Sequence, residues 1–201
     1  MKSQILSTKC KLKEKIFISL LGISLFITSI KLFLFNPLTL RGLAIFSILG
    51  LLFSLFTFLA YIDLKRLEVD RKISSILLIF FLTLNVVLFI IRNDFVIVIN
   101  NWEYIPYQNI LGAIALGTIT QLIVLLTKEK GLGQGDVRIS MIVGLLIGFD
   151  SILYWSYISV FTALIYGSVF ALKEKKKLKG LKIPFVPFMI LGVIIIVLIS
   201  L

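Results

Sequence analysis

Two aspartates stand where the chain passes between apolar and polar sequence. Asp63 directly follows an apolar run that ends at Ile62, and Asp136 directly precedes an apolar segment that begins at Val137. Ionisable groups at the edge of an apolar layer are costly, so they are candidates for function and need a partner. Each of these two aspartates is the natural partner of the other.

Two carboxyl groups that lie close together in a poorly solvated site cannot both ionise, so one of them retains a proton. The ionised group can take a proton from water while the neutral group donates one to a substrate carbonyl. This is general acid–base hydrolysis, without a covalent intermediate. Because such a pair titrates as a unit, Asp63 and Asp136 receive no separate acid and base roles.

Position alone allows a second interpretation of both residues. Asp136 at a helix N-terminus can simply bind the free N–H groups and complement the helix dipole. Asp63 can lie in headgroup water beside Lys65 and Arg66. On position alone, helix-end carboxylates and a reacting pair are equally good explanations.

A glycine-rich stretch leads into Asp136. Gly131, Gly133 and Gly135 can adopt positive φ and carry no Cβ, which would allow a tight loop and close approach of a peptide backbone. A glycine-rich loop before a helix can instead bind phosphate. The stretch is neither G-x-G-x-x-G nor followed by G-K-[ST], and an aspartate closes it, which disfavours an anion site.

Membrane helices must position these residues. The chain is 59% hydrophobic with a mean hydropathy of +1.09, whereas soluble domains are ~45–50% apolar. Its apolar runs lack the alternation of a barrel, and only helices or closed barrels satisfy the backbone in lipid. We predict an all-α transmembrane helical bundle, formed by a single domain over 16–201 after a basic tail at 1–15. The predicted spans lie at about 16–35, 42–62, 73–91, 109–127, 137–149, 151–172 and 183–201.

Basic residues orient this bundle. Most of the 21 Lys and Arg fall in four stretches, at 1–15, 63–72, 128–138 and 173–182. With seven spans these stretches share one side, which the positive-inside rule makes cytoplasmic, so the N-terminus is predicted to lie inside. The segment 137–149 is short for a span. It is expected to cross as a short or partly sunken helix, or else to form a re-entrant hairpin.

Composition excludes several classes of function. The chain has no histidine, which excludes histidine-dependent triads and zinc sites of the metalloprotease type. Its one cysteine, Cys10, allows neither an internal disulfide nor a cysteine-rich metal cluster. The net charge of +11 does not indicate nucleic-acid binding, because the basic residues lie between apolar blocks. No cofactor and no metal is expected.

Three motifs occur in order along the chain. The first is Ile62-Asp63 followed by Asp70, the second is GQGDVR at 133–138, and the third is KIPFVPF at 182–188. Together they resemble the I-D…P-D, G-x-G-D-[VF]-K and I-P-F-G-P-F motifs of the type IV prepilin peptidases. Those enzymes belong to the G-x-G-D group of intramembrane aspartic proteases. The chain departs from the family pattern at Val69, Arg138 and Val186, where the family has proline, lysine and glycine.

The resemblance implies an aspartic endopeptidase with Asp63 and Asp136 as its catalytic residues. Its implied substrates are type IV prepilin-like proteins, cut at the cytoplasmic face of the plasma membrane after a short basic leader. Longer relatives carry a loop with paired C-x-x-C motifs and a methyltransferase activity, and this chain has no such loop, so peptidase activity alone is implied. Supporting roles in the loop or motifs are implied for Gly133, Gly135, Asp70, Pro184 and Pro187.

Other interpretations stay open. A presenilin-like protease shares G-x-G-D but cuts within the membrane, and a non-catalytic transporter or assembly subunit could use the carboxylates as proton or cation sites. Asp70 is either a solvated loop charge or a support for the pair. Gly144 and Gly148 are expected to permit close helix packing rather than to bind a ligand.

Overall fold

The computed structural model describes residues 54–65, 69–91, 97–99, 102–129, 131–174 and 183–200, together with positions 19, 22 and 23. The predicted basic tail with Cys10, nearly all of the predicted first span and the start of the second lie outside the described residues. The lysine-rich residues 175–182 also lie outside them.

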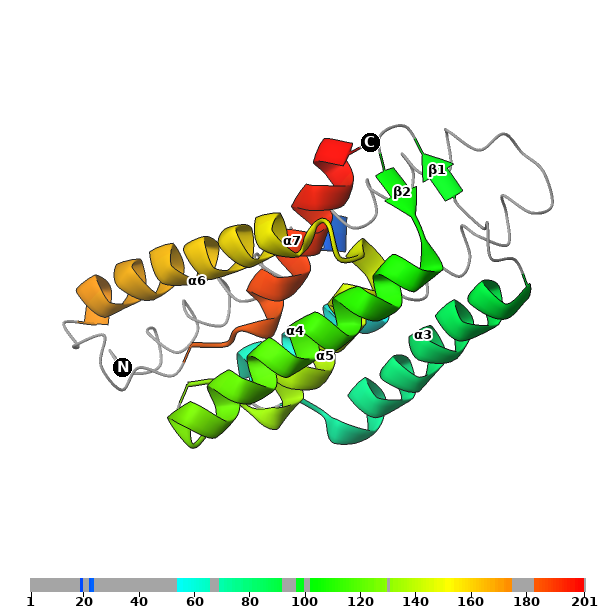
Figure 1. Ribbon diagram of the computed structural model, residues 1–201. Coiled ribbons are helices and arrows are strands. Elements are labelled where there is room, and N and C mark those ends of the chain that lie inside the picture. The colour runs from blue at the N-terminus through cyan, green and yellow to red at the C-terminus, as the bar shows by residue number, and fades with distance from the viewer. Residues whose placement is uncertain are drawn as a thin grey trace.

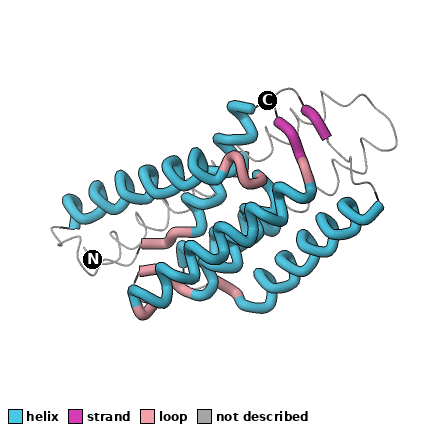
Figure 2. The backbone as a smooth tube through the Cα atoms, in the orientation of Figure 1, coloured by secondary structure: helices cyan, strands magenta, loops and turns pink. Residues whose placement is uncertain are grey.

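Helices dominate the described part of the chain (Figure 1, Figure 2). Residues 54–65 are helical. They are followed by α3 (Arg71–Ile91), α4 (Pro106–Thr127), α5 (Gln134–Ile147), α6 (Ile152–Glu174) and α7 (Val186–Ser200). The predicted all-α bundle is confirmed.

A small hairpin between α3 and α4 departs from the predicted pattern. Strand β1 (Ile97–Ile99) pairs antiparallel with β2 (Trp102–Tyr104), so that Ile99 lies opposite Trp102. The three residues of β1 are all β-branched, which favours extended backbone over helix. The hairpin is an addition to the bundle, and no other strand occurs among the described residues.

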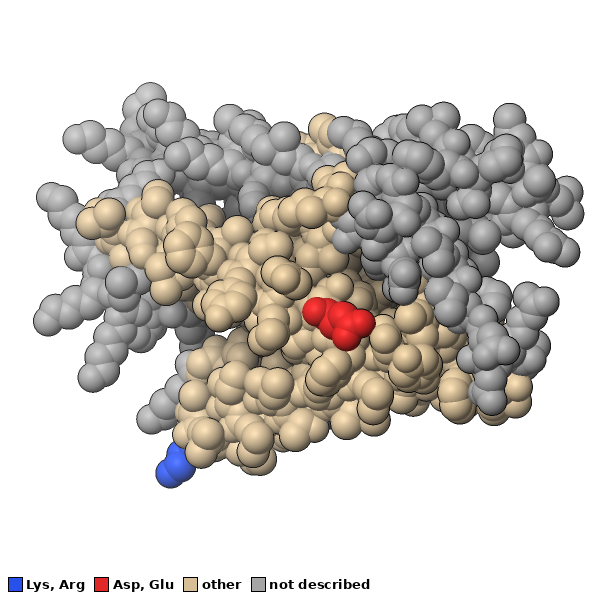
Figure 3. Space-filling model, turned by 45° about the horizontal axis from the view of Figure 1, so that its top comes forward, with Lys and Arg blue, Asp and Glu red and all other residues tan. Residues whose placement is uncertain are grey.

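Among the described residues, three helices are long and apolar enough to cross a membrane, namely Arg71–Ile90, Pro106–Thr127 and Ile152–Leu172. Large apolar side chains point outward from them: Leu126 is 82% exposed and Leu172 is 81% exposed. Figure 3 shows a face on which the described residues are almost entirely uncharged. Such a surface is suited to lipid rather than to water. The chain is therefore a helical membrane protein, whereas seven spans and an inside N-terminus remain predictions.

The short helix α5 lies at the centre of the described bundle. It packs against α3, α4 and α7, and runs alongside α4 in Figure 1. Eight of its residues are buried: Val137, Ile139, Ser140, Ile142, Val143, Gly144, Leu145 and Ile147. The helix begins three residues before the predicted segment 137–149 and ends two residues before its end, because the polar first turn belongs to the helix and Gly148 ends it with a φ of 74°.

Glycines allow α4 and α5 to touch backbone to backbone. A Cβ on Gly144 would lie 2.5 Å from the backbone nitrogen of Ala113 and 2.6 Å from the carbonyl oxygen of Gly112. This confirms the predicted packing role of Gly144. Gly148 differs, because its left-handed backbone ends α5 while its N–H donates to the Gly144 carbonyl at 3.1 Å.

The substitution Gly144→Ala is expected to destabilise the protein. Backbone atoms cannot move aside as a flexible side chain can, so overpacking of about 1–3 kcal/mol outweighs the gain in helix propensity of up to ~1 kcal/mol. The midpoint of thermal unfolding in detergent measures the effect. Gly131→Ala is the control, since a Cβ there meets nothing closer than Thr127 Cγ2 at 3.6 Å. Equal midpoints for the two variants would contradict the packing role.

A buried polar cluster holds the far end of α5. The Asn85 Nδ2 of α3 donates to the carbonyl of Phe81 at 2.9 Å and to that of Leu145 in α5 at 3.4 Å. The hydroxyl of Tyr104 donates to Asn85 Oδ1 at 2.9 Å. These hydrogen bonds join the hairpin, α3 and the C-terminal turn of α5.

A separate hydrogen bond connects α6 and α7: Trp155 Nε1 donates to the Met189 carbonyl at 2.9 Å.

Candidate active site

Asp63 lies within the helical segment 54–65 and is 5% exposed. Its Oδ2 accepts a hydrogen bond from the backbone N–H of Val186 at 3.0 Å. Val186 is the first residue of α7, so this N–H has no acceptor within its own helix. The carboxyl of Asp63 therefore lies at the N-terminus of α7, where the helix dipole favours negative charge.

The third motif explains why this amide is available. Phe188 and Met189 donate their N–H groups to the Phe185 carbonyl, at 3.0 and 3.1 Å. Pro187, the second residue of α7, has no N–H to donate, and proline is well tolerated in a first helical turn. Pro184 is buried just before the helix. The two prolines therefore frame the Val186 N–H that binds Asp63.

Asp136 lies in the first turn of α5, rather than before the helix as the sequence had indicated. Its Oδ2 accepts the N–H of Gly133 at 2.8 Å, and its own N–H donates to the Gly133 carbonyl at 3.0 Å. Gly133 is the N-cap of α5. Asp136 is partly buried. Both candidate carboxyls thus lie at helix N-termini, and the helix-end interpretation of Asp136 is correct as a description of its place.

The glycines act differently from the sequence-based expectation. Gly133 has a φ of −96°, which is extended backbone that any residue adopts. Among the described residues, positive φ occurs at Lys128, Glu129 and Gly148. The turn after α4 therefore has its positive φ at Lys128 and Glu129, and the predicted positive φ is absent at Gly133 and Gly135. Gly135 instead matters for space, because it lies against Val69.

Asp70 caps α3. Its Oδ1 accepts the backbone N–H groups of Lys72 at 2.9 Å and Ile73 at 3.1 Å. Its carbonyl accepts both the N–H and the hydroxyl of Ser74, at 3.1 and 2.8 Å. The side chain is exposed. Asp70 therefore holds the start of α3 in place.

The two candidate carboxyls, Asp63 and Asp136, interact electrostatically. Both lie outside the predicted spans 42–62 and 137–149. Burial and, to a smaller extent, the negative charge of Asp136 raise the pKa of Asp63 to about 6, against the opposing effect of the N–H groups of Val186 and Phe185. Burial also raises the pKa of Asp136, opposed by the Gly133 N–H. The charge on one carboxyl therefore acts on the other, and the pair favours holding a proton.

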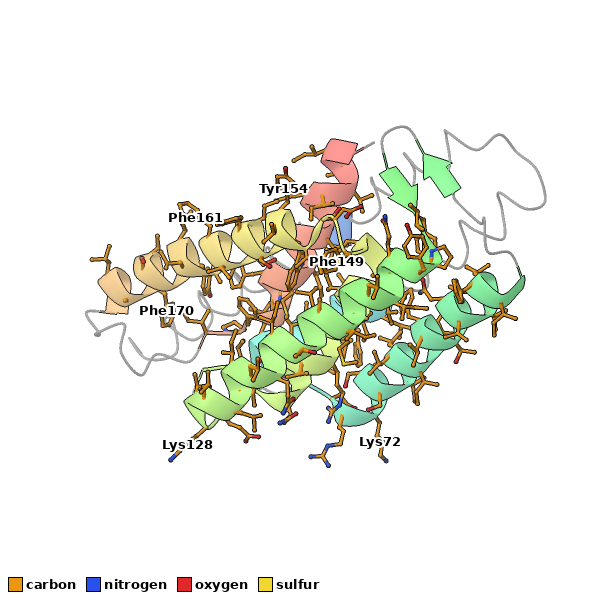
Figure 4. All side chains as sticks on the ribbon, viewed as in Figure 1. Lys72, Lys128, Phe149, Tyr154, Phe161 and Phe170 are labelled. Atoms are coloured by element: carbon orange, nitrogen blue, oxygen red, sulfur yellow. The ribbon has the colours of Figure 1, made fainter. Side chains whose placement is uncertain are left out.

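Lys72 and Lys128 point outward from the same end of the bundle in Figure 4. This is the end where α3 begins and α4 ends, so the described parts of the basic stretches 63–72 and 128–138 lie at one end of the bundle. The two carboxyls belong to this end as well. Asp136 lies in the first turn of α5, which follows directly on the turn after α4. Asp63 binds the first turn of α7.

No cluster of three His, Cys, Asp or Glu that could hold a metal ion occurs among the described residues. Asp63 and Asp136 accept hydrogen bonds from backbone N–H groups. These donors stabilise the carboxylates themselves and do not favour a bound metal cation. Sequence reasoning missed the Val186 amide and the Val69 side chain as neighbours of the site. A signal for both existed, since each stands at a position where the chain departs from the motif it resembles.

Asp63→Asn is expected to raise stability at neutral pH. Because the pKa of about 6 in the folded protein exceeds the ordinary 3.8, the folded state binds this proton more tightly than the unfolded chain. That stabilisation is fully present below about pH 4 and is lost as pH rises through about 6, a change of up to ~3 kcal/mol. Asparagine carries no charge to desolvate. The unfolding midpoint of Asp63→Asn will therefore fall less between pH 4 and 7 than that of the wild type.

The control for this measurement is Asp150→Asn, which removes an exposed carboxyl. Thermal unfolding of the three proteins in detergent at several pH values gives the comparison. Parallel midpoint curves for wild type and Asp63→Asn would contradict the raised pKa.

Fold and site together define a class: a helical membrane protein in which two interacting carboxyls lie at the N-termini of two helices. The model of the type IV leader peptidase family matches residues 50–168, more than half of the chain, including both aspartates. The chain belongs to the type IV leader peptidase family and is a protease of the leader-peptidase type. The third motif lies beyond the matched residues. No curated protein and no solved structure matches the chain.

Proposed function

We propose that this protein is an aspartic endopeptidase that uses Asp63 and Asp136 to remove the basic leader of type IV prepilin-like proteins. The observation that carries the proposal is the placement of these two carboxyls, one from each of two motifs, against the N-terminal amides of α7 and α5, where the charge of Asp136 acts on Asp63. The raised pKa of Asp63 brings the range in which one of the two carboxyls keeps a proton closer to neutral pH, and a singly protonated pair is the state that acid–base hydrolysis needs.

The pair would act on water and on the substrate carbonyl at once. The ionised carboxylate takes a proton from water as the water attacks, and the neutral carboxyl donates its proton to the carbonyl oxygen. Backbone N–H groups from Val186 and Gly133 stabilise the carboxylate form on either residue. Because both residues have such a donor, the proton can be shared rather than fixed on one of them.

The same arrangement supports a cytoplasmic site. Basic residues flank the end of the bundle that bears the two carboxyls, and the positive-inside rule assigns such an end to the cytoplasm of a plasma-membrane protein. The leader of a prepilin-like substrate meets its apolar helix at this depth. We further propose that 16–201 form one peptidase domain behind the tail 1–15, and that the chain has no methyltransferase activity, since it has no cysteine-bearing loop.

Co-expression with a tagged prepilin-like protein tests the function. Cleavage converts the precursor to a form of higher gel mobility, and mass spectrometry of the product locates the cut at the junction of leader and apolar helix. A precursor left intact by wild-type protein that has inserted in the membrane would count against the proposal. Proton-coupled uptake in vesicles, without cleavage, would favour the transporter interpretation.

Chelation is expected to leave cleavage unchanged. The two carboxyls activate water by themselves, so removal of divalent ions with EDTA removes no part of the reaction. The measurement is the rate of leader cleavage by purified protein before and after chelation. A loss that added Zn²⁺ or Mg²⁺ restores would instead indicate a metal-assisted reaction.

A further inference from the structure

Gly135 packs closely against the side chain of Val69. It lies in the first turn of α5, directly before Asp136, and a Cβ there would lie 2.5 Å from Val69 Cβ and 2.9 Å from Val69 Cγ2. Its backbone φ is not positive, so conformation does not require glycine. Glycine within a helix is less stable than alanine by roughly 0.5–1 kcal/mol. What requires glycine at this position is the space that the Val69 side chain occupies.

Val69 is itself held firmly. The next residue, Asp70, caps α3 through the two hydrogen bonds from Lys72 and Ile73. The Val69 side chain is partly buried and packs against the hydrophobic core. A β-branched side chain has restricted χ1, so its shape is well defined. The position of Val69 is thus tied to the start of α3.

We propose that Val69 is a positioning residue for the reaction, because its side chain fills the space left by Gly135 and so sets the place of Asp136 relative to Asp63. This inference rests on the proposed function. Asp63 is held separately, by the α7 amide of Val186. The Val69–Gly135 contact therefore acts on one member of the pair and leaves the anchoring of the other unchanged.

The contact has a measurable consequence for catalysis. An added Cβ at position 135 must displace either the first turn of α5 or the start of α3, since the nearest atom of Val69 is its own Cβ and cannot rotate away. A displacement of about 1 Å in a reacting group can lower the rate ~100-fold. Gly135→Ala is therefore expected to lower kcat/KM by about that factor.

The test is a reciprocal exchange. Val69→Gly removes every Val69 atom that crowds position 135, so Gly135→Ala combined with Val69→Gly is expected to cleave at least ~10-fold faster than Gly135→Ala alone. Val69→Thr, which keeps the branched shape, is expected to stay close to wild type. The matched control is Gly131→Ala, whose Cβ would meet nothing closer than 3.6 Å. Leader cleavage by purified protein gives kcat and KM for each variant.

The pH profile of kcat distinguishes a positioning role of Val69 from a role in stability alone. Val69→Ala loosens the contact and is expected to shift the acid limb of the kcat profile, since the coupling of the two carboxyls depends on their separation. Val197→Ala, a truncation of another buried valine, is expected to lower the unfolding midpoint and leave the profile in place.

The outcomes are distinct. Failure of wild-type protein to cleave any leader overturns the proposed function, and this inference with it. If wild type is active, full activity in Gly135→Ala overturns the inference alone. So does a folded double variant that is no faster than Gly135→Ala. If the double variant does not accumulate, an unshifted pH profile in Val69→Ala overturns the inference.

Discussion

Asp63→Asn and Asp136→Asn are each expected to abolish leader cleavage while the protein still inserts in the membrane and accumulates. Asparagine keeps the shape of aspartate and an oxygen that can accept the N–H of Val186 or Gly133, so the surrounding structure is preserved. It can neither accept a proton from water nor donate one as an acid. The rate should fall by at least ~10⁴-fold, as for the loss of one member of a catalytic group. Co-expression with a tagged prepilin-like substrate measures this.

The double variant is expected to be no less active than either single variant, because the two carboxyls act as a unit and the first substitution already removes the reaction. Asp150→Asn is the matched control, since it removes an exposed carboxyl and is expected to cleave normally. Substantial cleavage by either single variant would remove that residue from the catalytic pair.

Labelling of single cysteines is expected to place both carboxyls on the cytoplasmic side. In a Cys10→Ser background, cysteines replace Lys65, Glu129, Lys176 and, as the opposite-side control, Asn101. An impermeant thiol reagent added to intact cells should label the Asn101 position alone, because the other three belong to basic stretches that the positive-inside rule retains in the cytoplasm. The expected difference is all or none at each position.

Two other outcomes of this labelling are informative. Labelling at Lys176 would mean that α5 and α6 together do not return the chain to the cytoplasm, and it would correct the predicted topology without separating the pair. Labelling at only one of Lys65 and Glu129 would put Asp63 and Asp136 on opposite faces. Two carboxyls separated by a bilayer cannot share a proton, so this result would exclude the protease mechanism for these residues.

The long helices were predictable because apolar length is a local property. The expected spans 73–91, 109–127 and 151–172 correspond to α3, α4 and α6 within a few residues. The boundaries of α5 were less accurate, since a helix start with Gly133 as its cap and an aspartate in its first turn looks like polar loop in the sequence. The hairpin at 97–104 is too short for its alternation to stand out between two long apolar runs.

The candidate pair was predictable from position and motif, whereas its surroundings were not. The amide that binds Asp63 comes from Val186, far along the chain, and no local pattern indicates that contact. The glycines illustrate the same limit. A glycine can serve backbone conformation or close packing, and the sequence allowed both for Gly135, where the contact with Val69 shows the second.

The central place of α5 has a consequence for how the protein fits a bilayer. A helix of 14 residues is about 21 Å long, well short of a hydrocarbon core of ~30 Å. Exposed to lipid, it would create a hydrophobic mismatch that is relieved by local thinning of the bilayer or by snorkelling of flanking side chains. Here α3, α4 and α7 surround it instead. The position of Asp136 is therefore set by the neighbouring helices rather than by contact of α5 with lipid.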